Sequence, residues 1–267
     1  MKKLFFLSAA AVFLASAAFA SYITLATTVT ARVEGNTLKV LVKVINKGDE
    51  SAYNVQAEVR ALGQKILAKK TLELAVNGQY EAYEEIKVNL TKPGEYPLIV
   101  VMHYADANQY PFSALSCQTF NYKTSSLPAE IFGKMEAKKF WKKGSVSLTI
   151  KNLSEKELSL KTSLVGPREL NFPAEKELSI AGKGTVKTEF ELENFSALSG
   201  STYQLFAIAE YDSESLHQTT ITSGSVRLVQ EKSFGGLTYT QLLLILGALI
   251  IAFVVFQLRS PHPGNPK

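Results

Sequence analysis

The side chains that could carry out chemistry in this chain are few and widely spaced. Three histidines occur, His103, His217 and His262, together with the single cysteine Cys117 and 24 acidic residues. Ser/His/Asp catalysis would need His103 or His217 beside an activated serine, and the chain contains no G-x-S-x-G motif. Catalytic zinc would need an H-E-x-x-H motif or paired cysteines, which are also missing from the sequence. The residue types therefore predict no catalytic residue and no cofactor.

Carboxylates provide the remaining chemistry. A carboxylate pair for glycoside hydrolysis is assembled only by folding, so an envelope-polymer hydrolase stays open as an alternative. Asp49 and Glu50 are adjacent, but calcium prefers about six to eight oxygen ligands, which two side chains do not supply. Asp106 and Asp212 lie in turns that correspond to each other in an internal repeat. These two residues are the candidates for a calcium or partner contact, and the alternative is an ordinary solvated loop.

The elements that must position these residues read as β-strands. In "TLKVLVKV", Leu38, Val40, Val42 and Val44 fall on one face, which is the period of a strand with one buried side. Turn signals such as Asn77-Gly78 separate such segments, and no amphipathic helix is indicated between residues 21 and 231. Cys117, in "SALSCQTF", is expected to be a buried strand residue, with an intermolecular disulfide as the alternative.

Three blocks of the chain recur at a spacing of about 106 residues. Residues 40–55 match 147–160, with Asn46 above Asn152, residues 75–90 match 180–194, and residues 92–106 match 198–212. We therefore predict an all-β ectodomain of two tandem immunoglobulin-like β-sandwiches, domain 1 at 21–125 and domain 2 at 126–231. The alternative is one large β-barrel.

The two ends of the chain predict its topology. Residues 1–20 combine two lysines, an apolar run and Ala18-Phe19-Ala20, which is typical of a cleavable secretory signal peptide. Residues 237–258 contain no charge and, as a helix, would cover about 33 Å, enough for a bilayer core. Tyr239 and Arg259 suit the two interfaces. We expect a single-pass cell-membrane protein with its N-terminus outside, a stalk at 232–236 and a cytoplasmic tail at 259–267.

The net charge of +5 says little about partners. Lys2, Lys3, Arg259 and Lys267 belong to the targeting ends, so the exported part has 25 basic against 24 acidic residues. An almost neutral ectodomain gives no support to a nucleic-acid partner. The expected partners are the lipid bilayer and another envelope protein or glycan.

The stretch "VLVKVINKGDESAYNVQAEV" (40–59) carries a family resemblance. It resembles the first hairpin of the CARDB-like group of immunoglobulin-like sandwiches, found in bacterial and archaeal surface proteins including S-layer-type proteins. "VVMHYADANQ" (100–109) resembles a later strand and turn of that group, whereas the second copy departs from the motif after Asn152. The layout is also similar to the beta subunit of the translocon-associated complex, which has a single sandwich. The resemblance implies a fold more than an activity.

The motif itself has a structural explanation. Asn46 and Gly48 supply the backbone freedom that a turn between strands needs, Ala52 and Val55 re-enter the core, and Asn54 completes the A-x-N-V pattern. We interpret these residues as a structural turn motif of the sandwich.

"KMEAKKFWKK" (134–143) concentrates basic and aromatic side chains. The possible surface patch consists of Lys138, Lys139, Phe140, Trp141, Lys142 and Lys143. We expect it where the first strand of domain 2 begins, as a solvated edge strand, with a membrane-facing or domain-joining patch as the alternative. Three N-x-S/T sequons, at Asn89, Asn152 and Asn194, occur at about the frequency expected by chance.

These observations favour a membrane-anchored, non-catalytic cell-envelope protein that mediates adhesion, scaffolding or binding of a protein or glycan. One alternative is an accessory subunit of a membrane translocation or secretion complex, in which Gly247 and Ala248 would give room for helix contact. The other is the hydrolase. Fold alone does not choose among them.

Overall fold

The computed structural model of the chain describes residues 22–125, 128–173, 175–230, 233–234 and 237–259. The first half contains β1 (Leu25–Glu34), β2 (Thr37–Asn46), β3 (Ala52–Ala61), β4 (Gln64–Leu67), β5 (Thr71–Leu74), β6 (Gln79–Lys87), β7 (Gly94–Ala105) and β8 (Pro111–Tyr122). The second half contains β9 (Ile131–Ala137), β10 (Lys143–Asn152), β11 (Leu158–Val165), β12 (Leu170–Asn171), β13 (Lys176–Ile180), β14 (Thr185–Asn194), β15 (Thr202–Ser213) and β16 (Leu216–Arg227). After these come β17 (Ser233–Phe234), β18 (Leu237–Thr238) and α2 (Tyr239–Arg259). The prediction of an all-β body is confirmed for the described residues.

In the first half, two sheets enclose a hydrophobic core. One sheet has the order β1-β2-β6, and in the facing sheet β7 pairs with β8 and β3, while β4 and β5 both pair with β3. Leu38, Val40, Val42 and Val44 of β2 are all fully buried, as the alternation predicts. Strand pairing of this kind is that of an immunoglobulin-like β-sandwich.

The second half repeats this arrangement around a core of its own. Its sheets have the orders β9-β10-β14-β12 and β13-β11-β15-β16, and Val146, Phe190 and Leu205 are fully buried between them. The sequence blocks that recur at a spacing of about 106 residues occupy corresponding strands, β2 and β10, β6 and β14, and β7 and β15. Whether the halves fold as two independent domains stays a prediction.

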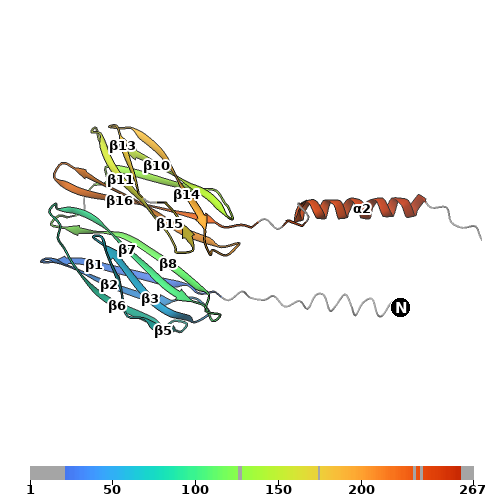
Figure 1. Cartoon of the computed structure of the whole chain (residues 1–267), viewed down its shortest axis with the longest axis horizontal. Coiled ribbons are helices and arrows are strands. Elements are labelled where there is room, and N and C mark those ends of the chain that lie inside the picture. Colours follow the sequence, from blue (N-terminus) through green and yellow to red (C-terminus); the bar gives the residue numbers. More distant parts are fainter. Residues whose placement is uncertain (1–21, 126–127, 174, 231–232, 235–236, 260–267) are drawn as a thin grey trace, which may run out of the picture.

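The two halves pack against each other along their long sides (Figure 1). A small apolar cluster lies between them, in which Phe206 and Ile208 of β15 meet Ile99 of β7 and Leu115 of β8. At one end, β16 and β7 form a single parallel bridge between His217 and Gly94. Because β15 runs antiparallel to β16, the equivalent strands β7 and β15 run in opposite directions. The outward face of β7 and β8 is therefore covered by the second half.

The close approach at that bridge explains one glycine. A Cβ atom on Gly94 would lie 2.0 Å from the carbonyl oxygen of His217, and the φ angle of Gly94 is 152°. No other residue type fits this position without moving the two halves apart.

The C-terminal region begins its helix two residues later than expected. Leu237–Thr238 form β18, which pairs with β17, and Ser233–Phe234 of β17 belong to the segment predicted as a stalk. Helix α2 then runs from Tyr239 to Arg259. Among the described residues, no helix has both the length and the apolar character needed to cross a bilayer. The predicted signal peptide (1–20) and the tail after Arg259 lie outside the described residues.

Candidate functional site

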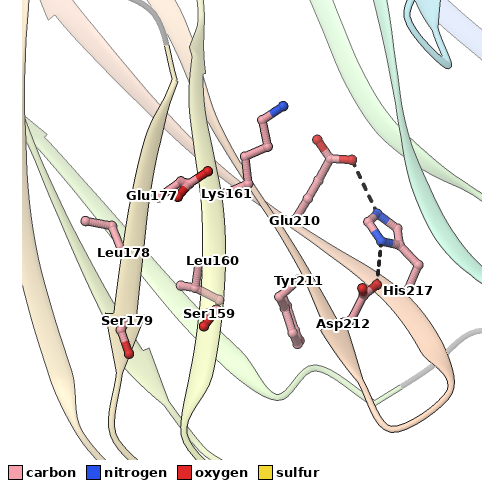
Figure 2. Close-up of a pocket in the computed structure, with 10 residues that line it drawn as sticks. All are labelled: Ser159, Leu160, Lys161, Glu177, Leu178, Ser179, Glu210, Tyr211, Asp212 and His217. Atoms are coloured by element: carbon pink, nitrogen blue, oxygen red, sulfur yellow. Dashed lines mark hydrogen bonds and ion pairs between the residues drawn. The ribbon is translucent and has the colours of Figure 1, made fainter.

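A hollow of about 660 Å³ on the second half is lined by several titratable side chains (Figure 2). Four strands contribute to it, and its lining consists of Ser159, Leu160, Lys161, Glu177, Leu178, Ser179, Glu210, Tyr211, Asp212 and His217. Strand alternation places Glu210 and Asp212 on the same face of β15, and the hairpin register puts His217 of β16 directly opposite Asp212.

His217 is clamped between two carboxylates. Its Nδ1 lies 3.1 Å from Oδ1 of Asp212, and its Nε2 lies 3.3 Å from Oε1 of Glu210 (Figure 2). The ring also stacks on Tyr96 of the first half, with centroids 4.3 Å apart and planes at 14°. Burial disfavours the charged imidazole, but the hydrogen bonds that the ring donates to Glu210 and Asp212 outweigh it and raise the pKa of His217 above its usual value.

Asp212 links this cluster to the first half of the chain. Its Oδ2 accepts a hydrogen bond from Nζ of Lys92 at 2.7 Å. That bond, together with the one from His217, holds the pKa of Asp212 below its usual value in spite of partial burial. The His217 cluster is therefore a charge network at the junction of the two halves.

Both nitrogens of the His217 ring are engaged within the cluster. Because each nitrogen faces a carboxylate oxygen, a protonated ring donates a hydrogen bond at both positions. The hydroxyl of Ser179 is engaged with Glu157 on the rim. In the described part of the chain, no group of three or more His, Cys, Asp or Glu side chains is arranged to hold a metal ion.

A second cluster lies on the first half, around the buried carboxylate of Glu58. The side chain of Glu58 is only 3% exposed and is paired with Arg60, with Lys65 at 2.9 Å and with Nε2 of His103 at 3.0 Å. Burial would raise the pKa of Glu58, but hydrogen bonds from Lys65, His103 and Arg60 dominate and lower it to about 2. A hollow of about 510 Å³ borders this cluster and extends to Arg168 of the second half.

The candidate loop aspartates, Asp106 and Asp212, have different surroundings. Oδ1 of Asp106 accepts the backbone N–H of Tyr110 at 2.8 Å and closes the turn between β7 and β8. Asp212 lies instead in the His217 cluster. The structure thus gives Asp106 a local turn contact and Asp212 a contact between the halves.

The turn-motif residues lie inside the fold. Asn46 is fully buried, as are Ala52 and Val55, and a Cβ atom on Gly48 would lie 2.2 Å from the carbonyl oxygen of Tyr22. Asn54 has a left-handed φ of 54°, and its side-chain amide donates to Gln109 at 2.8 Å. Asn54 therefore faces the Glu58 hollow, which the motif alone did not indicate.

The basic patch follows β9, the first strand of the second half. Residues 134–137 of the stretch belong to this strand, which lies at the edge of its sheet, and the patch then connects β9 to β10, of which Lys143 is the first residue. Phe140 is buried and forms an isolated bridge with Leu228, Trp141 is half-buried, and the four lysines are exposed. The packing of Phe140 against the end of β16 explains why the chain turns between the two strands.

The three sequons differ in burial. Asn89 is exposed and Asn194 is half-buried, but Asn152 is fully buried with its amide donating to backbone carbonyls.

Burial makes the single cysteine a poor nucleophile. It raises the pKa of the Cys117 thiol to about 12, and the side chain packs against the apolar cluster between the halves.

Sequence reasoning named His217 and Asp212 separately but did not bring them together or add Glu210. The i, i+2 spacing of Glu210 and Asp212 is the signal that could have grouped the two carboxylates. No local signal could have placed Lys92 or Tyr96 there, because both belong to the other half.

Comparisons with known proteins give similarity of fold at a low level. No family model matches the chain, and no curated protein matches it. Among solved structures, Salmonella alpha-2-macroglobulin reacted with methylamine shares 14% identity over 78% of this chain and 16% of its own, with a TM-score of 0.32. Red sea bream transglutaminase shares 11% identity over 78% of this chain and 31% of its own, with a TM-score of 0.29.

The periplasmic chaperone SfaE shares 14% identity over 78% of this chain and 99% of its own, with a TM-score of 0.30. This chain thus spans less than a third of the length of the matched transglutaminase and macroglobulin. At these scores the matches carry no argument about activity, substrate or partner.

Proposed function

We propose that this chain is a membrane-anchored, non-catalytic cell-envelope protein whose paired sandwiches form a docking platform for an envelope protein or glycan. The observation that carries the proposal is the packed contact between the two halves. Apolar packing of Phe206 and Ile208 against Ile99, together with the Lys92–Asp212 ion pair, joins two small sandwiches into one larger body. A body of this kind suits presentation of surfaces more than enclosure of a reaction.

The His217 hollow is the docking site that we favour. Its rim includes β13, a five-residue strand that pairs with β11 on one side only among the described residues, so its other edge is open to strand addition. Glu177 and Ser179 on that strand are exposed and offer acceptor oxygens to a partner. A protein segment with basic or hydroxyl-bearing side chains, or a glycan, would match this chemistry.

The anchor is proposed from the sequence. Residues 237–258 lack charge, Tyr239 and Arg259 flank them, and residues 1–20 have the pattern of a secretory signal. Membership of the CARDB-like group belongs to the same proposal, on the strength of the hairpin motif at 40–59.

Anchoring can be tested first. Full-length protein tagged at its C-terminus should stay with membranes through carbonate extraction, and external protease should digest residues 22–230 in spheroplasts while sparing the tag. Release by carbonate, or digestion of the tag in place of the body, would contradict the proposed topology.

Docking can then be tested by site-specific photo-crosslinking in native membranes. A photo-reactive residue at Ser179, on the rim of the hollow, should capture a discrete partner. The matched control is Lys151, which is exposed on β10 of the opposite sheet. Equal products from both positions would reject the hollow as the docking site, and capture only from Gly247 in α2 would favour an accessory subunit of a membrane complex.

A further inference from the structure

The end of the second half from which the chain leaves toward α2 is framed by two loops. The first, the lysine loop, is residues 138–142, directly before Lys143 of β10, and the second, the Phe195 loop, is residues 195–201. The N–H of Val229 donates to the carbonyl of Phe140 at 2.8 Å, and the N–H of Gln230 donates to Oγ of Ser199 at 2.9 Å. Val229 and Gln230, which follow β16, are thus hydrogen-bonded to both loops at the point where the chain leaves the sandwich.

The lysine loop holds cationic groups without acidic partners. Lys138, Lys139 and Lys142 are exposed, and none of them has an ion pair within the described part of the chain. Lys143 has only a long contact, 3.7 Å, with Glu193. Most of the ion-paired lysines elsewhere in the described residues lie within about 3 Å of a carboxylate. The three lysines of the loop that have no ion pair therefore leave a positively charged surface.

The Phe195 loop adds exposed apolar groups to the same surface. Phe195 is 73% exposed and Leu198 is 41% exposed. Phe195 and Trp141 line one shallow hollow together with Lys142, so the apolar and cationic groups adjoin each other. Trp141 is half-buried, so part of this residue stays at the surface.

We propose that these two loops form a membrane-docking surface that binds anionic phospholipid headgroups, and this inference rests on the proposed anchoring by α2. Lysines next to a bilayer are drawn to anionic lipid, and Trp and Phe are the side chains that enter the headgroup region. Only eight residues separate Gln230 from Tyr239, and β17 and β18 fold part of them into a hairpin. The tether therefore keeps this end of the body within about 30 Å of the start of the helix.

Docking would fix the orientation of the whole body. The surface lies at the end of the body from which the chain exits toward α2. Contact of this end with lipid would make the long axes of both sandwiches point away from the membrane plane. The His217 hollow lies near the opposite end of β16, since His217 is the second residue of that strand and Arg227 is the last. The proposed partner site would then face away from the membrane.

Trp141 is the only tryptophan in the chain and reports directly on this contact. Full-length protein in nanodiscs should show quenching of Trp141 fluorescence by headgroup-labelled doxyl lipid when anionic lipid is present, and little quenching in purely zwitterionic nanodiscs. The variant K138Q/K139Q/K142Q should weaken docking by about 100-fold, because each lysine near an anionic surface contributes roughly a factor of five. High salt should weaken it in the same direction.

The matched control is K87Q/K151Q/K187Q, which removes the same charge from exposed positions away from the exit. Wild-type quenching in this control is the expected result, and near-UV circular dichroism establishes that both variants are folded. Equal quenching in the two triple variants, or none in the wild-type protein, would overturn the proposal. So would a Trp141 spectral shift that follows protein concentration and not lipid charge, since that would indicate contact with a second copy.

Failure of the anchor gives a different pattern. Protein released by carbonate that still binds anionic vesicles through Trp141 would reject the proposed anchor and keep the docking surface. Protein retained by membranes without lipid-dependent quenching would keep the proposed anchor and reject the docking surface.

Discussion

The side chains of Asn46 and Asn152 make the same hydrogen bonds in the two halves of the molecule. In each, the amide nitrogen donates to the carbonyl four residues later, at 2.7 Å, and to the carbonyl twenty-eight residues later, at 3.1 and 3.3 Å. In each, the side-chain oxygen accepts the backbone N–H two residues later, at 3.0 and 2.9 Å. Both side chains are fully buried and join the start of one loop to the end of another.

Replacing either asparagine should therefore destabilise the fold. Asn46→Ala removes the side chain that accepts from the buried N–H of Gly48 and donates to the buried carbonyl of Leu74, and Asn152→Ala removes the equivalent contacts in the second half. We expect each substitution to lower the free energy of unfolding by about 2–3 kcal/mol. Urea unfolding of the full-length protein in mild detergent, followed by circular dichroism, measures the change. Asn36→Ala, at an exposed turn position, is the control and should change stability by less than about 0.5 kcal/mol.

Much of this fold could be predicted from residue patterns because the determining interactions are local or repeated. Alternation placed Leu38 to Val44 in the core, and the alignment of Asn46 with Asn152 identified two residues with the same role. The contact between the halves could not be placed in this way. Its one sequence signal is the run "LIVVM" in β7, whose apolar residues fall on both faces of the strand and so indicate burial on both sides. The pattern shows that a second cover exists but not which surface supplies it.

The contact between the halves includes a polar latch that no local pattern indicates. Glu169, in the loop between β11 and β12, is fully buried and accepts hydrogen bonds from the backbone N–H of Ser113 at 3.0 Å and from its hydroxyl at 2.6 Å. A buried polar side chain is costly to leave without hydrogen-bond donors of this kind. The latch therefore depends on both halves being docked.

Weakening this contact should uncouple the unfolding of the halves. Trp141 packs against the core of the second half, so its fluorescence reports that half, whereas circular dichroism reports both. In wild-type protein we expect the two signals to change together. In Phe206→Ala/Glu169→Gln, loss of apolar packing and weakening of the hydrogen-bonded latch should separate the two transitions in urea. Coincident transitions in this variant, with no loss of stability, would show that the contact contributes nothing.

Cys117 offers a chemical test of the same contact. A thiol with its pKa raised to about 12 has, at pH 8, a thiolate fraction about a thousandfold lower than a thiol with a pKa of 9. Native protein should therefore react very slowly with iodoacetamide, and urea should restore the ordinary rate. The Phe206→Ala/Glu169→Gln variant should react faster than wild type without denaturant, because the opened contact exposes the thiol. Rapid labelling of the native wild-type protein would contradict the packing of Cys117 described here.

His217 should make the stability of the junction depend on pH. Its pKa is higher in the folded than in the unfolded chain, so its stabilising contribution is complete below the unfolded value of about 6.5 and is lost as the pH rises through the folded pKa. The groups that contact the His217 ring are Glu210 and Asp212 from β15 and Tyr96 from β7. Lys92, from the loop before β7, pairs with Asp212.

His217→Gln should remove this part of the pH dependence while keeping a polar side chain at the bridge to Gly94. The measurement is the urea midpoint of each protein at about pH 6 and at about pH 8.5. The midpoint of the wild-type protein should be higher at pH 6 than at pH 8.5, and this difference should be smaller in the variant. Glu210→Gln, which removes one of the two carboxylates that favour the charged ring, should reduce the difference without abolishing it. A wild-type difference that survives unchanged in His217→Gln would show that another group titrates, and that the clamp between Glu210 and Asp212 does not stabilise the junction.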